Sequence, residues 1–265
     1  MQDKAKEYID ILISLEPVFK KAGELSLKMR STAGSKNKFS TGVAGIDIVT
    51  ETDTAVQEFI LSEMVKTKLV ECELIAEEDT ALAKKFNGTN GLVLTLDPID
   101  GTLLYANGKN FFLTIVSLHD DKNLLYTFLN YPVFNWSRRI TDKVEDFGKK
   151  PEIKTNPKID LSKTISYTVR PPKIIDQNIY QTLIGEGYKF VKASEITDEA
   201  GSTTLFSLGK TAGYYMETPN PYDGLVDLHY AKTKDFKIYA YVDFSKTHPT
   251  DHGPHYHGWY VVIRK

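Results

Sequence analysis

Residues 91–102 read G-L-V-L-T-L-D-P-I-D-G-T and hold the densest local pattern in the chain. The short apolar run over residues 92–96 is bounded by glycine and proline, which predicts a buried β-strand. Asp97 and Asp100 follow it, and Gly101 allows a close approach of the backbone. Two carboxylates at a strand end, beside exposed backbone N–H groups, suit a hard cation and a phosphate. A capped turn uses the same residue types, so the stretch alone leaves both interpretations open.

The composition is that of an ordinary globular protein. The chain has 265 residues, of which 41% are hydrophobic and 26% charged, a length that suits one large domain or two modest ones. The net charge of −2 provides no basic field for a nucleic acid polymer. Cys72 is the only cysteine, and the sequence shows neither a signal-peptide core nor an apolar run of membrane-spanning length. We therefore expect a cytoplasmic protein without a membrane partner.

The first half of the chain predicts helices and an antiparallel sheet. Apolar residues at helical spacing predict one long helix over residues 3–30. The small, Gly-rich residues 31–45 predict a mobile loop, and the alternation over residues 46–50 predicts a strand edge. Further strands are predicted at residues 69–76, 111–118 and 124–131, the last two as an antiparallel hairpin.

A second helix is predicted to begin near residues 52–54. Thr54 and Gln57 are spaced as a capping box, in which each side chain would bond a backbone N–H of the first turn. Asp53 lies at the same helix start. Taken alone, an acid at this place indicates a cap that stabilises the helix dipole.

Residues 141–160 are polar, Lys-rich and contain two prolines, which is typical of a domain boundary. We therefore expect domains over residues 1–150 and 151–265. Alternating elements predict an α/β second half, with strands at residues 164–169, 188–191, 236–244 and 259–263 and helices at residues 176–183 and 202–208. The segment with His248, His252, His255 and His257 is interpreted as a polar turn before the last strand, with a Zn²⁺ or Ni²⁺ site as the alternative.

Acidic residues recur where predicted strands end or helices begin, namely at Asp53, Glu77, Asp97, Asp100 and Asp223. Each alone is typical of a helix cap or a solvated loop. Strand ends are also where ligands gather on a sheet, and acids packed together there would not all stay ionised without cations. Mg²⁺ fits best, because it prefers carboxylate and carbonyl oxygens beside substrate phosphates. Zinc is disfavoured, because no Cys/His set accompanies these acids.

The same residues carry a resemblance to a known family. D-P-I-D-G-T at 97–102 resembles the signature of the inositol monophosphatase family of metal-dependent, lithium-sensitive phosphatases. V-T-E-T-D at 49–53, I-A-E-E at 75–78, G-S at 201–202 and Y-D at 222–223 match it in order and spacing.

This resemblance implies an α+β fold, a layered α-β-α-β-α sandwich with an antiparallel sheet and helices in the N-terminal half. The C-terminal half would be a smaller α/β part that contributes Asp223. The resemblance also implies a phosphoric monoester hydrolase that acts on a small phosphorylated metabolite, and it favours a homodimer.

The resemblance further implies two or three Mg²⁺ ions per site. Glu77, Asp97 and the carbonyl of Ile99 would hold the first ion. Asp97, Asp100 and Asp223 would hold the second, and Asp53 with Glu77 a weaker third.

Catalytic roles follow from the same motifs. Thr102, paired with Asp53 and assisted by Glu77, would orient and activate the water that attacks phosphorus. The N–H groups of Gly101 and Thr102 would cradle the phosphate. These roles concern the phosphate group of the substrate. They do not identify the alcohol to which that phosphate is esterified.

Three departures from the family pattern bear on that alcohol. Leu103 and Leu104 follow the Gly-Thr pair, and the block after Asp223 lacks the family's later Gly pair. Met216 falls at the ungapped position of the acid that holds sugar hydroxyls, with Glu217 one residue later. Inositol monophosphate is the first substrate expected. The alternatives are 3′-phosphoadenosine 5′-phosphate (a 3′(2′),5′-bisphosphate nucleotidase activity), fructose-1,6-bisphosphate, or a degenerate protein that binds a phosphometabolite without turnover.

Overall fold

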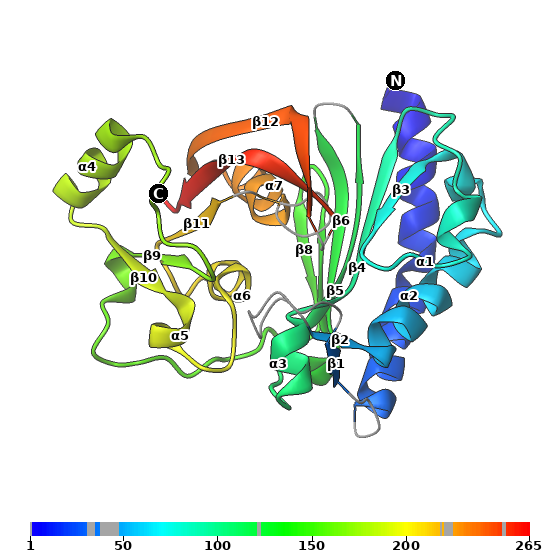
Figure 1. Cartoon of the computed structure of the whole chain (residues 1–265), viewed down its shortest axis with the longest axis horizontal. Helices are drawn as coiled ribbons and strands as arrows, with labels where there is room; N and C mark the ends of the chain where they lie inside the picture. The colour runs from blue at the N-terminus through cyan, green and yellow to red at the C-terminus, as the bar shows by residue number, and fades with distance from the viewer. Residues whose placement is uncertain are drawn as a thin grey trace. The chain divides into compact units, whose positions relative to one another are not determined.

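The computed structural model describes residues 2–30, 35–37, 48–120, 123–217, 219, 225–250 and 253–265. For residues 2–4, 35–37, 48–50, 244–250 and 253–256 only the backbone is described. The chain divides into two compact units, Met1–Lys149 and Lys150–Lys265. Helices and two larger mixed sheets build these units (Figure 1), as the α+β prediction requires.

A six-stranded sheet forms the centre of the first unit, in the order β3-β4-β5-β6-β7-β8. The strands are β3 (Glu73–Ala76), β4 (Val93–Asp100), β5 (Leu113–His119), β6 (Leu124–Tyr131), β7 (Trp136–Ile140) and β8 (Val144–Phe147). β3 and β4 are parallel, whereas every other neighbouring pair is antiparallel. The predicted β5–β6 hairpin is confirmed. β7 and β8 were not predicted.

Two helices cover one face of this sheet, α1 (Gln2–Met29) and α2 (Glu51–Met64) (Figure 1). The apolar stripe of α1, including Leu12 and Phe19, is fully buried in one cluster with Leu96 and Phe128 of the strands. Full burial of such a side chain contributes about 1.5–3 kcal/mol relative to exposure. In addition, β1 (Ser35–Asn37) pairs antiparallel with β2 (Ile48–Thr50), directly before α2.

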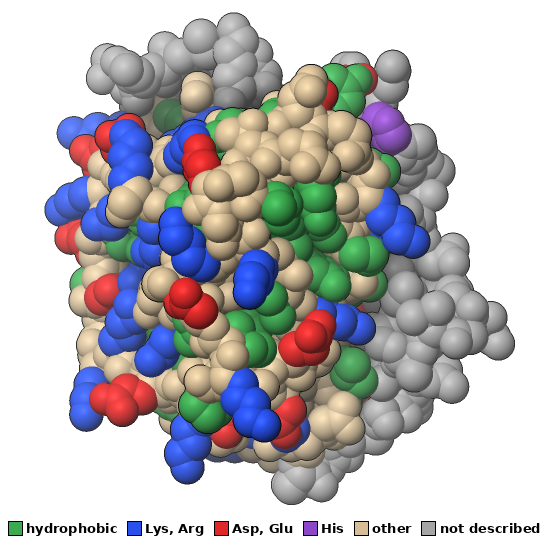
Figure 2. All heavy atoms as spheres, turned by 90° about the vertical axis from the view of Figure 1, so that its left-hand side faces the viewer, with side chains coloured by type: hydrophobic (Ala, Val, Ile, Leu, Met, Phe, Trp, Pro, Cys, Tyr) green, Lys and Arg blue, Asp and Glu red, His purple; other side chains and the backbone are tan. Residues whose placement is uncertain are grey.

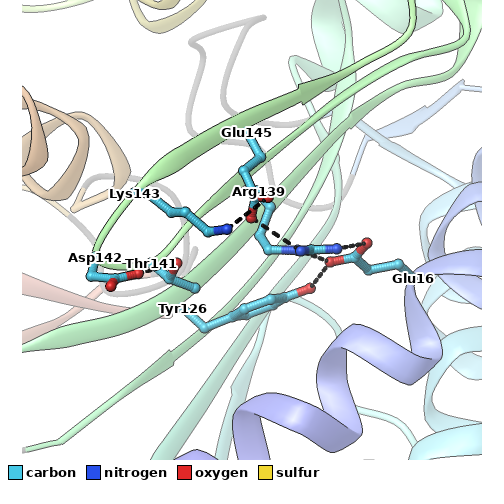
Figure 3. Close-up of polar contacts among 7 residues, drawn as sticks. All are labelled: Glu16, Tyr126, Arg139, Thr141, Asp142, Lys143 and Glu145. Atoms are coloured by element: carbon cyan, nitrogen blue, oxygen red, sulfur yellow. Dashed lines mark hydrogen bonds and ion pairs between the residues drawn. The ribbon is translucent and has the colours of Figure 1, made fainter.

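An ion-pair network also fastens α1 to the sheet (Figure 3). The Arg139 guanidinium on β7 donates to both Glu16 oxygens, with N–O distances of 2.6 and 2.8 Å. The Tyr126 hydroxyl donates to Glu16 at 3.2 Å. On the other side, Glu145 accepts from Arg139 at 3.1 Å and pairs with Lys143 at 3.0 Å. A bidentate Arg–carboxylate pair fixes geometry as well as charge, so this network sets the position of α1 across β6 and β7.

Two predicted boundaries in the first unit are wrong. Residues Lys68–Glu71 form a short 3-10 helix instead of strand, because the Thr67 side chain accepts a hydrogen bond from the Leu69 N–H and caps it. β4 does not end at Asp97 but continues to Asp100. The proline inside it is tolerated because the ladder is irregular there.

The second unit is built on a five-stranded sheet in the order β10-β9-β11-β13-β12. Its strands are β9 (Thr164–Tyr167), β10 (Lys189–Lys192), β11 (Gly213–Glu217), β12 (Lys237–Thr250) and β13 (Gly253–Ile263). Four helices accompany them, α4 (Gln177–Gly185), α5 (Ala193–Ile196), α6 (Ser202–Ser207) and α7 (Val226–Thr233). β10, β9 and β11 are parallel, as an α/β half requires, and β11, β13 and β12 are antiparallel.

The predicted polar turn around the histidines is wrong for most of its length. Residues 247–250 belong to β12 and residues 253–256 to β13, where His248 and His255 are cross-strand neighbours in register. The two strands extend the sheet ladder through this polar segment, because a hairpin satisfies backbone groups whatever the side chains are. The side chains of His248, His252 and His255 lie outside the described residues, so the Zn²⁺ or Ni²⁺ alternative is left as an expectation.

Candidate functional site

Glu77 and Asp97 follow directly from the pairing of two parallel strands. Ala76 of β3 lies beside Leu96 of β4, and the Glu77 N–H donates to the Leu96 carbonyl at 3.1 Å. The next residue of each strand is an acid, so both carboxylates belong to the same edge of the sheet. Asp97 is 3% exposed. The register therefore brings together two of the predicted metal ligands from separate strands.

Asp97 and Asp100 flank an irregularity in β4. Asp97 lies opposite Ile115 of β5 and Asp100 opposite Leu113, so three residue steps on β4 match two on β5. The Thr114 hydroxyl donates to the Pro98 carbonyl at 2.9 Å within this bulge. Bulges re-aim side chains next to functional sites. Here the extra residue on β4 places the carboxylates of Asp97 and Asp100 and the carbonyl of Ile99 within one short stretch of the chain.

Gly101 makes the turn from β4 into α3 (Thr102–Ala106). Its φ of 84° lies in the left-handed region, where a residue with a Cβ is strained. The Asp100 carboxylate accepts a hydrogen bond from the Gly101 backbone N–H. The strand, the turn and the helix thus hold Asp97, Asp100 and Thr102 in one continuous unit.

Burial raises the pKa of Asp100 to about 6 from an ordinary value of 3.8, and the Gly101 hydrogen bond opposes that rise. Removal from water disfavours the charged form of a carboxyl group. A bound cation would have the opposite effect, because it favours the ionised form. Binding of a cation at this site would therefore favour ionisation of Asp100.

The Thr102 hydroxyl donates to the Ile99 carbonyl at 3.0 Å. A hydroxyl carries a single proton, so in this arrangement it does not donate to Asp53 at the same time. The predicted Thr102–Asp53 pair is left as a proposal. Asp53 itself is 1% exposed and lies in the first turn of α2.

Tyr105 connects the helix of Thr102 to that of Asp53. Its hydroxyl is hydrogen-bonded to the Ser26 carbonyl at 2.8 Å and to Thr52 Oγ1 at 3.2 Å. Burial raises the pKa of Tyr105, the hydrogen bond to Thr52 lowers it, and the Asp53 carboxylate nearby raises it. No pattern in the sequence indicates this role, because a tyrosine three residues after Thr102 is typical of an ordinary helix core.

Gln57 fixes the loop that carries Glu77. It is fully buried, its Nε2 donates to the Glu78 carbonyl at 2.6 Å, and its Oε1 accepts from the Glu78 N–H at 3.0 Å. The capping-box prediction for Thr54 and Gln57 is therefore wrong, because the amide serves a tertiary contact instead of its own helix end. α2 thus positions both Asp53 and the loop after β3.

The donor chemistry of this site fits a hard cation, since it offers carboxylate and backbone carbonyl oxygens. Asp223 lies outside the described residues, so the structure does not place it. Among the described residues, no group of three His, Cys, Asp or Glu side chains is arranged as a metal site. Glu77 with Asp97, and Asp100 with Gly101 and Thr102, are the predicted site residues that the fold brings together.

In the second unit, Met216 and Glu217 lie on opposite faces of β11, since successive strand residues alternate. The Tyr215 hydroxyl donates to Glu217 Oε2 at 3.0 Å. Met216 accepts a contact from the Tyr214 hydroxyl on the other face, with an O–S distance of 3.6 Å. Glu217, which lies one residue after the expected position of the family's acid, is therefore also on the opposite face of the sheet from Met216.

The surface in Figure 2 carries Lys and Arg side chains interspersed with Asp and Glu. Among the described residues on this face, neither charge sign forms a continuous field. No helix in the described part of the chain is both long and apolar enough to span a bilayer.

Comparison with known proteins agrees with the resemblance. The model of the Inositol monophosphatase family matches residues 11–223. Inositol monophosphatase 3 of Solanum lycopersicum is 29% identical over 117 residues, which are 44% of this chain and 41% of that protein. Inositol monophosphatase 2 of Mus musculus is 36% identical over 93 residues, which are 34% of this chain and 32% of that protein. The chain thus matches less than half the length of these curated relatives.

Solved structures share the fold. The Thermotoga maritima IMPase superposes with a TM-score of 0.62 at 17% identity, covering 96% of this chain and 92% of that one. An IMPase/NADP phosphatase complexed with Mg²⁺ and phosphate superposes with a TM-score of 0.61 at 16% identity, covering 98% and 91%. The family match covers most of the chain, and the protein therefore belongs to the inositol monophosphatase family.

Proposed function

We propose that the protein hydrolyses a small phosphate monoester in a Mg²⁺-dependent reaction, with inositol monophosphate as the first substrate. The observation that carries this proposal is the register of β3 and β4, which sets Glu77 beside Asp97 at one sheet edge. The turn into Thr102, at Gly101, comes four residues after Asp97. Membership of the family supports the same reaction class.

In this proposal Asp97, Glu77, Asp100 and the Ile99 carbonyl hold the metal, with Asp223 and Asp53 completing the set. Mg²⁺, when bound, offsets the negative charge of the phosphate and lowers the pKa of water. The chain's own part is to place Asp100, an acid whose pKa is raised by burial, where that charge arrives.

Thr102 has two parts in the proposed chemistry. Its hydroxyl rotates from the Ile99 carbonyl toward Asp53, so that Asp53 takes the hydroxyl proton while Thr102 Oγ1 takes one from the attacking water. The backbone N–H groups of Gly101 and Thr102 receive the phosphate oxygens. General base assistance of this kind contributes about 10²–10⁴-fold to a rate.

A separate observation, on Met216 and Glu217, supports a second class of substrate. Met216 offers no hydrogen bond acceptor of a carboxylate kind, and the Glu217 carboxylate is occupied by Tyr215 on the opposite face of β11. A substrate that relies less on sugar hydroxyls, such as 3′-phosphoadenosine 5′-phosphate, is therefore the second candidate. Fructose-1,6-bisphosphate is the remaining alternative. Lithium sensitivity and a cytoplasmic location are further predictions of the sequence.

Phosphate release from these three substrates, with Mg²⁺ or with excess EDTA, tests the proposal. Wild type should release phosphate from one of them only with Mg²⁺, and Asp97→Asn should release none. Asp79→Asn is the matched control, because the Asp79 side chain is 82% exposed and forms a surface ion pair with Lys84. Turnover in EDTA, or in Asp97→Asn, contradicts the proposal. Tight phosphate binding without turnover in wild type would instead indicate the degenerate binder.

A further inference from the structure

The helix that begins with Thr102, α3, is only five residues long. Helices of this length are not stable in water by themselves, and the residue before it, Gly101, has no side chain that could cap it. α3 therefore depends on tertiary contacts to hold the Gly101–Thr102 turn in place. One set of contacts comes from the C-terminal end of α1, which lies at the same end of the first unit (Figure 1).

A small apolar cluster anchors α3, distinct from the large cluster between the helices and the sheet. Its buried members are Ile99, Tyr105 and Phe112, and Leu27 of α1 and Val133 pack against them. The rings of Tyr105 and Phe112 meet edge to face, with their centroids 4.9 Å apart. Because stabilisation by burial scales with the apolar area removed from water, so small a cluster holds α3 weakly without further contacts.

Arg30, which directly follows α1, covers this cluster. Its guanidinium lies 5.1 Å from the centre of the Phe112 ring and 5.6 Å from the centre of the Tyr105 ring. It also donates to the Lys109 carbonyl and lies 3.5 Å from Asn110 Oδ1, in the loop after α3. Burial lowers the pKa of Arg30, and a partly desolvated cation is attracted more strongly to a ring face.

The first of the two rings, Phe112, supports the turn that leads into Thr102. A Cβ built on Gly101 would lie 3.7 Å from the Phe112 Cα and 3.7 Å from the Phe111 carbonyl oxygen. The backbone before β5 is therefore packed directly against the turn. By holding the Phe112 ring, Arg30 limits the movement of this turn.

The second ring, Tyr105, leads to Asp53. The Tyr105 hydroxyl is hydrogen-bonded to the Ser26 carbonyl at 2.8 Å and to Thr52 Oγ1 at 3.2 Å. Thr52 directly precedes Asp53 in the first turn of α2. The ring that Arg30 covers thus joins α1, α2 and α3 at one point.

We propose that Arg30 is a positioning residue: by stacking on two rings, it holds Thr102 and Asp53 in the relative position that proton transfer between them requires. This inference rests on the proposed function, in which these two residues take a proton from the attacking water. Arg30 acts through Phe112 and Tyr105. A displacement of about 1 Å caused far from the chemistry can lower a rate roughly 10²-fold, so loss of Arg30 should reduce kcat.

Steady-state kinetics test the effect on the reaction. Arg30→Met should lower kcat roughly 10–100-fold and leave KM within about threefold of wild type, because the phosphate still binds but the proton relay is misplaced. Arg30→Lys keeps the charge but loses the planar face, so it should recover only part of the rate. Arg139→Met is the matched control. It removes another arginine that fastens α1 and that lies 5.0 Å from the centre of the Phe147 ring, and kcat should stay unchanged.

Hydrogen exchange tests the position of α3 without substrate or metal. The Tyr105 N–H donates to the Gly101 carbonyl at 2.9 Å, and the Asn107 N–H to the Leu103 carbonyl at 3.1 Å. In metal-free Arg30→Met these two amides should exchange roughly tenfold faster than in wild type, because α3 opens locally. Their exchange should stay unchanged in Arg139→Met. Circular dichroism checks that both variants are folded.

Three outcomes overturn the proposal. The first is wild-type exchange at Tyr105 and Asn107 in Arg30→Met, which would show that Arg30 does not hold α3. The second is faster exchange in Arg30→Met with an unchanged kcat. The third is an equal loss of kcat in Arg30→Met and Arg139→Met, which would indicate a general effect of stability.

A failure of the proposed function has a different signature. Wild type would then release no phosphate from any of the three substrates, whereas the exchange comparison would still decide whether Arg30 holds α3.

Discussion

Carboxylates lie against the six-stranded sheet in two regions, and the groups that balance their negative charge differ between the two. At β6 and β7, Glu16 receives two hydrogen bonds from Arg139, and these bonds hold the pKa of Arg139 above its usual value (Figure 3). At the end of β4, burial raises the pKa of Asp100 to about 6, with a backbone N–H as the opposing influence. The chain supplies a full positive charge in the first region and a backbone dipole in the second.

With the proposed function, this contrast would separate structural acids from functional ones. A carboxylate with a bidentate arginine has its charge neutralised by the fold and serves to fix α1 on the sheet. Burial disfavours ionisation of the other carboxyl group, and a bound cation would favour it. Perturbed ionisation of the second kind is typical of functional sites.

The largest expected effect is on catalysis at Thr102. Thr102→Ala should lower kcat by roughly 10²–10⁴-fold, because it removes the hydroxyl that we propose passes the proton from water to Asp53. Steady-state kinetics with and without saturating Mg²⁺ measure this, and Thr102→Ser should retain most of the rate. A change in KM alone would make Thr102 a phosphate clamp instead.

The second effect is on stability in the other region. Arg139→Met leaves the buried Glu16 carboxylate without its positively charged partner, which costs about 3 kcal/mol of unfolding free energy. The double variant Glu16→Gln/Arg139→Met should recover part of that loss, since no buried charge remains. Urea denaturation measures the first effect, and phosphate release per folded molecule should match wild type. Loss of activity in folded Arg139→Met would remove the distinction between the two regions.

The third effect is a pH dependence of stability in metal-free protein. The folded-state pKa of Asp100, about 6, lies above its ordinary value of 3.8, so the folded protein holds this proton more tightly than the unfolded chain does. The contribution of Asp100 is therefore complete below about pH 4 and is lost as pH rises through 6.

Asp100→Asn should consequently be more stable than wild type at pH 7 in EDTA, by on the order of 2 kcal/mol. The difference should shrink toward pH 4. Thermal or urea denaturation at several pH values measures it. Equal stability of the two proteins at pH 7 would show that burial of the Asp100 carboxyl carries no cost.

The smallest effect concerns Tyr105. Tyr105→Phe keeps the edge-to-face ring contact with Phe112 at 4.9 Å but loses the hydroxyl, at a cost of about 1 kcal/mol. We expect less than a tenfold fall in kcat and a higher Mg²⁺ requirement, because Asp53 is less firmly placed. Tyr126→Phe, which loses the bond to Glu16, is the matched control with a similar stability cost and unchanged kinetics. If Tyr105→Phe and Tyr126→Phe changed the kinetics to the same extent, the role of Tyr105 would be structural only.

The sequence predicted those parts of the fold that depend on local periodicity. The β5–β6 hairpin follows from alternation around a polar turn, and the strand-end acids follow from the apolar run before Asp97. β7 was missed because Arg138 and Arg139 interrupt its apolar pattern, and β8 because it lies in the polar residues 141–160 that were interpreted as a domain boundary. The bidentate partner of Arg139 is Glu16, which is 123 residues away in the chain, and no local pattern reveals such a partner.

The candidate site was predicted in part for the same reason. Asp97, Asp100 and Gly101 lie within one motif, and Glu77 joins them through a strand register that follows from the order of the predicted strands. Tyr105 and Gln57 act through tertiary hydrogen bonds to other elements, which leave no spacing in the sequence.

Metal binding itself is the most direct test of the account. Calorimetric titration of Mg²⁺ into metal-free protein, with and without inorganic phosphate, compares wild type with Asp97→Asn and with the exposed control Asp79→Asn. We predict that wild type and Asp79→Asn bind Mg²⁺ with the same stoichiometry, and that Asp97→Asn loses at least one ion while remaining folded. Identical isotherms for wild type and Asp97→Asn would contradict the assignment of the β3–β4 edge as the metal site.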